Sequence, residues 1–316
     1  MNKTQAINKL IKVFDINEIF AQRVFSLVDD KEDLISEASQ LILEKPKPFV
    51  KWVGGKRQLL NQFKLLNLYP PKGFNPLKAR YYEPFVGGGA VFFDLLPKNA
   101  FLSDLNRELM TTYNEIKNNV EDLIHSLRMH KIEKEYFLKI RAFDVNMLSD
   151  LEIASRFIYL NRTCFNGLYR VNKKGQFNVP FGKYKNPLIC DQDNLRKVSK
   201  ALQGIELKVG SYSEILTSAK KGDFVYLDPP YYPLSKTSSF TAYTNQCFLE
   251  KEQVKLRDTF LELSEKGCFV MLSNSDTPFT RKIYSEAKIT KVYAGRMINS
   301  NALKRGKISE LVITNY

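Results

Sequence analysis

Tyr81-Tyr-Glu-Pro-Phe-Val-Gly-Gly-Gly89 is the clearest fold signal in this 316-residue chain. It predicts a strand, Tyr81–Val86, whose glycines turn the chain into an apolar helix that runs to Leu96. Strand-like and helical runs alternate beyond it, which predicts an α/β fold with a parallel, doubly wound sheet. The other expected elements are strands at Ala100–Leu105, Asp223–Asp228, Cys268–Ser273 and Ile308–Thr314, and a helix at Asn106–Leu127.

The chain is expected to divide into a main α/β domain and two additions. Residues 1–45 show helical spacing of apolar side chains and end at Lys45-Pro-Lys-Pro48, which cannot continue a helix. Residues 111–215 fit the alternation poorly and are expected to form an inserted, mostly helical domain. The main domain would then comprise residues 46–110 and 216–316. The apolar positions that indicate N-terminal helices are Ile7, Leu10, Ile11, Phe14, Leu34, Ala38, Leu41 and Ile42.

Charge is spread unevenly along the chain, whose formal net charge is +14. The first 45 residues carry six Lys or Arg and eight Asp or Glu, whereas the remainder carries 42 and 26. A body this basic favours a polyanionic partner, because each phosphate contact releases condensed counterions.

Several function classes are disfavoured by composition. Widely separated cysteines and only two histidines argue against a zinc site, a disulfide framework or histidine acid–base chemistry. No apolar run approaches the roughly 18 residues of a membrane span, and the first residues lack the apolar block of a signal peptide. A cytoplasmic protein without a metal site is therefore expected. The residues concerned are Cys164, Cys190, Cys247, Cys268, His125 and His130.

The residues around the first strand indicate a site for an adenosine-bearing ligand. Gly87 and Gly89 would let the backbone approach a ligand, and Asp104 ends the second strand, where a carboxylate can bind ribose hydroxyls. Lys51-Trp-Val-Gly-Gly-Lys-Arg57 could fold over the same ligand. Plainer explanations exist, because glycine turns without ligands are common and Asp104 could cap the following helix.

Asp228-Pro-Pro-Tyr231 follows the apolar run Phe224–Leu227 and is the candidate catalytic motif. Two prolines stop the strand and stiffen the chain at the carboxyl edge of the sheet, where ligands of this fold class bind. The Asp228 carboxylate and the Pro229 carbonyl could accept hydrogen bonds from both N–H groups of an exocyclic amine and aim its lone pair at a methyl group. Tyr231 would stack on the base. The alternative is that Pro229 and Pro230 only terminate the strand.

Two basic, turn-rich motifs in the insert interleave aromatic residues with Arg, Lys and Asn. Arg and Lys suit guanine edges and phosphates, Asn suits adenine, and an aromatic ring can wedge into stacked bases. The same composition would also fit a solvated hairpin. The motifs are Tyr159-Leu-Asn-Arg-Thr-Cys-Phe-Asn-Gly-Leu-Tyr-Arg170 and Val171-Asn-Lys-Lys-Gly-Gln-Phe-Asn-Val-Pro-Phe-Gly-Lys-Tyr-Lys-Asn-Pro187.

In this order, the motifs resemble those of the Dam-type DNA adenine methyltransferases, in which the recognition domain lies between the cofactor motif and the catalytic motif. The resemblance runs from about Phe49 to Tyr316 and is strongest to the GATC-methylating members of restriction–modification systems. It implies a Rossmann-like, S-adenosylmethionine-dependent core that methylates adenine N6 in duplex DNA after base flipping. The segments that carry it are Phe49-Val-Lys-Trp-Val-Gly-Gly-Lys56, Tyr82-Glu-Pro-Phe-Val-Gly-Gly-Gly89, Phe165-Asn-Gly-Leu-Tyr-Arg170, Phe177-Asn-Val-Pro-Phe-Gly182 and Asp228-Pro-Pro-Tyr231.

The resemblance also implies roles for individual residues. Where Phe165 stands, some relatives carry Tyr, so stacking should survive but a hydroxyl contact would not. The N-terminal extension of 48 residues receives no role from it. The implied cofactor residues are Trp52, Lys56, Gly87, Gly89, Asp104 and Asp228, with Phe85 beside the adenosine. The implied DNA residues are Lys51 and Arg170 as readers of guanine, Phe165 as intercalator, Asn166 as the strand-positioning residue, and Asn178.

The partners implied in this way are double-stranded DNA and a companion restriction endonuclease that forms no stable complex with the enzyme. The enzyme itself is expected to be a monomer or a weak dimer. Two alternatives remain open from the sequence. One is a cytosine-N4 or RNA adenine methyltransferase, because the tetrapeptide could orient any exocyclic amine, and the other is a DNA-binding relative without catalysis.

Overall fold

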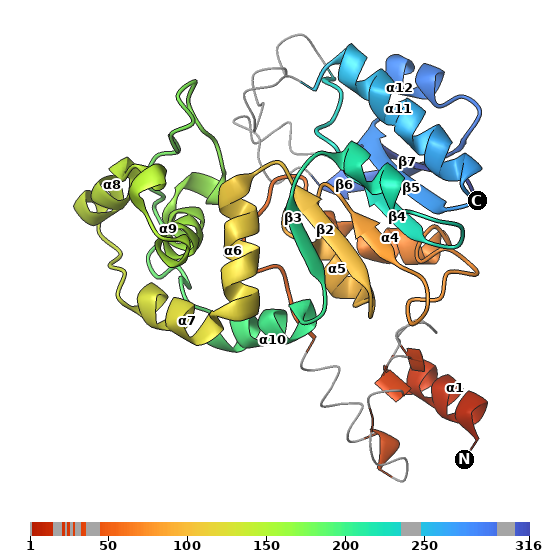
Figure 1. Cartoon of the computed structure of the whole chain (residues 1–316), viewed down its shortest axis with the longest axis horizontal. Coiled ribbons are helices and arrows are strands. Elements are labelled where there is room, and N and C mark those ends of the chain that lie inside the picture. The colour runs from red at the N-terminus through yellow and green to blue at the C-terminus, as the bar shows by residue number, and fades with distance from the viewer. Residues whose placement is uncertain are drawn as a thin grey trace.

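The centre of the protein is a seven-stranded sheet in the computed structural model, which describes residues 2–14, 21–22, 24–25, 28, 33–35, 45–234, 248–295 and 307–316. The strand order is β3-β2-β1-β4-β5-β7-β6 (Figure 1). The strands are β1 (Tyr81–Glu83), β2 (Ala100–Asp104), β3 (Glu206–Val209), β4 (Phe224–Leu227), β5 (Phe269–Ser275), β6 (Lys288–Gly295) and β7 (Lys307–Thr314).

Strand direction confirms the expected α/β architecture, with one correction. Neighbouring strands from β3 to β5 are parallel, whereas β7 is antiparallel to both β5 and β6. The expectation of a parallel sheet is therefore wrong for the last strand. The physical reason is that β6 and β7 follow each other in the chain and pair directly, and a chain that returns beside its preceding strand runs antiparallel to it, whereas a parallel pair needs a crossover.

The central strands bury side chains in two hydrophobic cores, one on each face of the sheet. Tyr81 and Tyr226 belong to one core, and Tyr82, Val225 and Leu227 belong to the other. Successive side chains of a strand point to opposite faces, so a strand that is covered on both sides reads as a continuous apolar run. All four residues of β4 are buried, which explains why this strand was recognisable in the sequence.

Two strands were not predicted, and both lie at an edge of the sheet. The residues of β3 are largely exposed, and β6 fully buries just one residue, Val292. An edge strand that is mostly exposed to solvent lacks the continuous apolar run, or the regular alternation of apolar and polar residues, that identifies central strands. β3 also lies near the end of residues 111–215, which were assigned to the insert, yet it pairs with β2 in the central sheet.

Helices α6 to α10 form a body beside the sheet, and α6 connects the two parts (Figure 1). The single helix expected at Asn106–Leu127 is two helices, because Asn119 leaves the helical conformation between α6 and α7. The 3-10 turns are η1 (Lys56–Gln58), η2 (Val145–Met147), η3 (Phe165–Gly167) and η4 (Tyr212–Thr217). The helices are α4 (Leu60–Leu65), α5 (Ala90–Leu95), α6 (Arg107–Asn118), α7 (Val120–Arg128), α8 (Lys134–Ala142), α9 (Asp150–Thr163), α10 (Gln192–Leu202), α11 (Glu250–Glu265) and α12 (Pro278–Ile283).

Helix α1 (Lys3–Phe14) follows the apolar spacing expected at the N-terminus. Its buried residues Ile7 and Leu10 share a small core with Val24 and with Leu96 of the α/β domain. In the described ranges, none of the helices has the length and apolar character that crossing a bilayer requires. Among the residues named above, Ala38, Leu41, Ile42 and Cys247 lie outside the described residues.

Candidate active site

The glycine turn between β1 and α5 depends on two glycines with positive φ. Gly89, at φ 68°, precedes α5, and a Cβ atom there would lie 2.7 Å from the Tyr113 hydroxyl. Gly87, at φ 46°, lies so close to Trp52 that a Cβ atom would be 2.5 Å from the indole ring. The structure thus brings together the glycine turn and Trp52, two features that the sequence analysis assigned to one site.

Glu83, which the sequence analysis quoted without a role, holds this turn against α5. Its buried Oε2 accepts hydrogen bonds from the Tyr81 hydroxyl at 2.9 Å and from the Phe92 backbone amide at 3.1 Å. Burial raises the pKa of Glu83 to about 8. A carboxylate inside an apolar strand was the signal available for finding it.

Asp104 ends β2 with both carboxylate oxygens turned to backbone amides. Oδ2 accepts from Gly87 at 3.1 Å, and Oδ1 accepts from Asn106 at 3.0 Å. Burial raises the pKa of Asp104, and these amide hydrogen bonds oppose the rise. The alternative role of Asp104 as a helix cap is not what the structure shows, because Asn106 caps α6 by accepting from Leu109.

Asp228 directly follows β4 and forms an ion pair with Lys56, whose Nζ lies 2.7 Å from Asp228 Oδ1. Lys56 is only 3% exposed, and its Nζ also donates to the Gly54 carbonyl at 2.6 Å. Burial raises the pKa of Asp228 to about 6, while the Lys56 charge pulls it down. The expected loop over the site is therefore joined to the candidate catalytic motif by a partly buried ion pair.

Tyr231 is held by a residue that the sequence analysis did not single out. Its hydroxyl donates to Glu310 Oε2 of β7 at 2.7 Å, and Lys56 Nζ lies 4.9 Å from the centre of its ring. Pro229 is buried and Pro230 is exposed. Because β4 and β2 are the two neighbours of β1, Asp228 and Asp104 lie at the same edge of the sheet, on either side of the glycine turn.

Phe85 is part of an aromatic cluster that packs against the core on the opposite face of the sheet from Trp52. Its ring stacks on Tyr212 at 5.3 Å between centroids and meets Phe248 edge-on at 6.0 Å. Tyr212 belongs to η4 and Phe248 precedes α11, so three distant segments build the cluster. Trp52 packs against one core of the sheet and Phe85 against the other.

The two insert motifs form an irregular hairpin closed by isolated bridges. Phe165 is 49% exposed, and Asn166 adopts a left-handed conformation with φ 56°. Arg170 Nε donates to Asn178 Oδ1 at 2.7 Å, and Arg170 Nη2 donates to the Asn178 carbonyl at 3.2 Å. Asn178, expected among the DNA contacts, thus orients Arg170 in this structure.

Lys51 is joined to the same hairpin by a residue without an assigned role, Asn161. The Lys51 amide donates to Asn161 Oδ1, and Asn161 Nδ2 donates to the Lys51 carbonyl, both at 2.8 Å. Asn161 Nδ2 also donates to the Gly167 carbonyl at 3.0 Å. Gly167 is so close to Lys51 that a Cβ atom would lie 2.4 Å from its Cδ. The expected DNA residues Lys51 and Phe165 are therefore neighbours.

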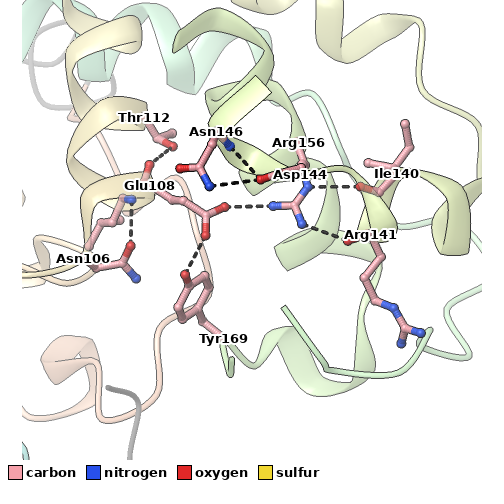
Figure 2. Close-up of polar contacts among 10 residues, drawn as sticks. Asn106, Glu108, Thr112, Ile140, Arg141, Asp144, Asn146, Arg156 and Tyr169 are labelled. Atoms are coloured by element: carbon pink, nitrogen blue, oxygen red, sulfur yellow. Dashed lines mark hydrogen bonds and ion pairs between the residues drawn. The ribbon is translucent and has the colours of Figure 1, made fainter. Parts of the chain in front are cut away.

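A largely buried carboxylate of α6, Glu108, bonds two side chains of the insert, Arg156 and Tyr169, as Figure 2 shows. Arg156 Nη1 donates to one of its oxygens and the Tyr169 hydroxyl to the other, both at 2.8 Å. Arg156 also donates to two backbone carbonyls of α8, each at 3.0 Å. The Tyr169 ring stacks on Trp52 with 6.0 Å between centroids. These contacts connect the helical body with the glycine turn.

Comparison with known proteins agrees with this geometry. Residues 52–298 match the family described as D12 class N6 adenine-specific DNA methyltransferase. The type II methyltransferase M1.LlaDCHI of Lactococcus lactis subsp. cremoris is 45% identical over 85% of this chain and 95% of its own length. The type II methyltransferase M.MjaIII of Methanocaldococcus jannaschii is 44% identical over 85% and 99%. The DNA adenine methylase of Escherichia coli K12 is 35% identical over 85% and 95%.

Proposed function

Because the chain belongs to the D12 class of N6 adenine-specific DNA methyltransferases, we propose that Asp228-Pro-Pro-Tyr231 is the corner that holds the target adenine. The observation that carries this assignment is the ion pair between the buried Lys56 and the partly exposed Asp228, which places a charged acceptor at the carboxyl edge of the sheet. Ligands of open α/β sheets bind at this edge.

S-adenosylmethionine is the methyl donor that the residues at this edge fit. Asp104 has lone pairs left for ribose hydroxyls after accepting two backbone amides, and Phe85 offers an aromatic cluster to an adenine ring. Two residues of the Lys51–Arg57 loop border the site: Trp52 lies against Gly87, and Lys56 pairs with Asp228. When bound, the cofactor supplies a methyl group on a positively charged sulfur.

The corner makes a poor nucleophile react by orienting it. The lone pair of an adenine amine is conjugated with the ring, and hydrogen bonds from its two N–H groups to the Asp228 carboxylate and the Pro229 carbonyl favour a pyramidal nitrogen. The nitrogen lone pair forms the new N–C bond while the methyl–sulfur bond breaks with its electrons left on sulfur. Asp228 stabilises the positive charge that develops on nitrogen, and the nitrogen then loses a proton to water.

The proposed target is the adenine of 5′-GATC in duplex DNA, flipped out of the helix because its amine is otherwise inaccessible to the corner. Lys51 and Arg170 would read guanines, and the half-exposed Phe165 would enter the base stack. Asn166 and Asn178 would position the strand and Arg170. Residues 111–215 apart from β3, which belongs to the central sheet, would form the recognition domain, within a monomer or weak dimer. The type II relatives support a restriction–modification role with a companion endonuclease.

Incubation with plasmid and S-adenosylmethionine, followed by nucleases that discriminate methylated from unmethylated GATC, tests the site. We expect protection of GATC and N6-methyladenine in nucleoside mass spectrometry. N6-methyladenine without GATC protection would refute the proposed site and leave the chemistry standing.

The role of the corner is tested separately with Asp228→Ala. Loss of the carboxylate should lower methyl transfer at least about 100-fold, because an acceptor made for the transition state is gone. DNA binding, measured by fluorescence anisotropy, should change little. Asp122→Ala, on the exposed face of α7, is the matched control and should leave both quantities unchanged. Equal collapse of binding and transfer in Asp228→Ala would contradict the assignment.

A further inference from the structure

Two buried amide side chains lie behind the Asp228-Pro-Pro-Tyr231 corner and are bonded to each other. Gln253 comes from α11 and Asn274 from β5, and both are 0% exposed. Asn274 Nδ2 donates to Gln253 Oε1 at 2.8 Å. This bond fixes which end of each amide remains for the corner, namely the Gln253 donor and the Asn274 acceptor.

Those two remaining ends bond the residues on either side of Tyr231. Gln253 Nε2 donates to the Pro230 carbonyl at 3.0 Å, and the Tyr232 amide donates to Asn274 Oδ1 at 3.2 Å. The Ser275 hydroxyl adds a third bond by donating to the Tyr232 carbonyl at 2.6 Å. The backbone that carries Tyr231 is therefore held from α11 and from β5 at once.

The corner needs such support because its own backbone offers few hydrogen-bond donors. Pro229 and Pro230 have no N–H group, so the chain after β4 cannot be held through amide donors at these two positions. Burying two amides costs free energy unless every polar atom is paired, and an apolar pair would fill the space without that cost. The paired amides therefore point to a positional role rather than to stability alone.

We propose that Gln253 and Asn274 are positioning residues for methyl transfer. They hold the Pro230–Tyr232 backbone so that the neighbouring Pro229 carbonyl and Asp228 carboxylate keep the geometry that orients the amine. This inference rests on the proposed role of the corner. According to this inference, the positions of the acceptors in the corner depend on residues of α11 and β5, which lie outside the Asp228-Pro-Pro-Tyr231 motif.

Gln253→Glu gives the sharpest test, because its effect should depend on pH. An ionised glutamate would still accept from Asn274 but would turn a second acceptor toward the Pro230 carbonyl. We expect the single-turnover rate of methyl transfer to fall roughly 10- to 100-fold at about pH 8, since displacements of about 1 Å have effects of this size. Affinities for DNA and S-adenosylhomocysteine should stay within about twofold.

Lowering the pH should partly rescue this variant. A buried carboxyl has a raised pKa, and once protonated it can donate to the Pro230 carbonyl as glutamine does. The ratio of Gln253→Glu rate to wild-type rate should therefore rise several-fold between about pH 8 and about pH 6. An added negative charge that acted only by keeping Asp228 protonated would move this ratio in the opposite direction.

Gln253→Met and Gln203→Glu complete the design. The methionine variant fills the space without a donor, so its rate should fall at every pH without rescue. Gln203 donates its Nε2 to the Lys117 carbonyl at 2.8 Å on the exposed end of α10, and its change to Glu should leave the rate unchanged. Wild-type rates in both Gln253 variants, or losses that follow weaker ligand binding at a constant ratio across pH, would overturn the inference. An active Asp228→Ala enzyme would instead overturn the proposed role of the corner.

Discussion

The Asp228 carboxylate lies under the influence of two charges of opposite sign. Burial raises its pKa to about 6, the Lys56 ammonium at 2.7 Å lowers it, and the Glu310 carboxylate raises it. Because the proposed mechanism needs the ionised form as acceptor, methyl transfer should decline as the pH falls through about 6. The single-turnover rate against pH, at saturating DNA and cofactor, measures this acid limb.

The two neighbours of Asp228 should shift the acid limb in opposite directions. Lys56→Met removes the charge that favours the carboxylate, so the midpoint should move to higher pH. Glu310→Gln removes a repelling charge and can still accept from the Tyr231 hydroxyl, so the midpoint should move to lower pH. Shifts of the same sign in both variants would show that Asp228 is not the group that titrates.

Asp104 and Asp228 could be singled out from the sequence as candidates, whereas most of the residues that contact the candidate site from behind could not. Asp104 and Asp228 stand at the ends of apolar strands, where topology gathers ligand-binding side chains. Asn161 and Gln253 sit inside helices and acquire their roles from partners 110 and 23 residues away. Tyr231 similarly bonds Glu310, which is 79 residues away in the sequence. Sequence patterns predict that Glu310 lies in a strand, but they do not predict which residues of the neighbouring strands lie beside it.

The segment from Lys47 to Lys51 is held by one asparagine from α9 and another from α10. Asn161 bonds both the amide and the carbonyl of Lys51, and Asn194 bonds both groups of Lys47 at 2.8 and 2.9 Å. Arg162 of α9 also donates to the Phe49 carbonyl at 2.7 Å. The loop that carries Lys51, Trp52 and Lys56 is therefore anchored to the helical body at its start, and to the sheet through the Lys56–Asp228 ion pair.

These matched asparagines separate stability from DNA recognition. Asn161→Ala and Asn194→Ala should each lower the free energy of unfolding by roughly 2 kcal/mol, because each removes at least two hydrogen bonds from a buried side chain to the backbone. Only Asn161→Ala should also weaken DNA binding markedly, since it alone releases Lys51 from the Gly167 turn. Urea unfolding and fluorescence anisotropy measure the two effects. Equal losses of DNA affinity in both variants would contradict a local role for Asn161.

Edge strands mark the limit of what sequence patterns predict about the elements. The central strands contribute to both cores of the sheet, and their apolar runs allowed these strands to be predicted from the sequence. β3 and β6 are largely exposed or only partly buried, so neither has a continuous apolar run. The antiparallel β7 was predicted as a strand, but its direction was not. Direction depends on which strand lies next to it, and that information is not local to residues 307–314.

At the scale of the whole molecule, the proposed DNA surface and the proposed cofactor edge share one loop. Lys51 faces the hairpin, and the next residue, Trp52, packs between Gly87 of the glycine turn and Tyr169 of the insert. Glu108 bonds both Tyr169 and Arg156 (Figure 2). The ring of Tyr169 stacks on Trp52, so an aromatic stack connects the helical body with the sheet. Ordering of this loop by one ligand should assist binding of the other.

Binding of DNA and of S-adenosylhomocysteine should therefore be coupled. We expect duplex DNA to tighten S-adenosylhomocysteine binding by about fivefold or more, and S-adenosylhomocysteine to tighten DNA binding by the same factor, as linkage requires. Isothermal titration with and without the second ligand measures both factors. Tyr169→Leu removes the ring that stacks on Trp52 and should bring the factor close to one, whereas Tyr293→Leu, on the half-exposed edge strand β6, should leave it unchanged. A wild-type enzyme in which neither ligand alters the affinity for the other would show that the shared loop is already ordered before either binds, and the aromatic stack would then be a packing contact alone.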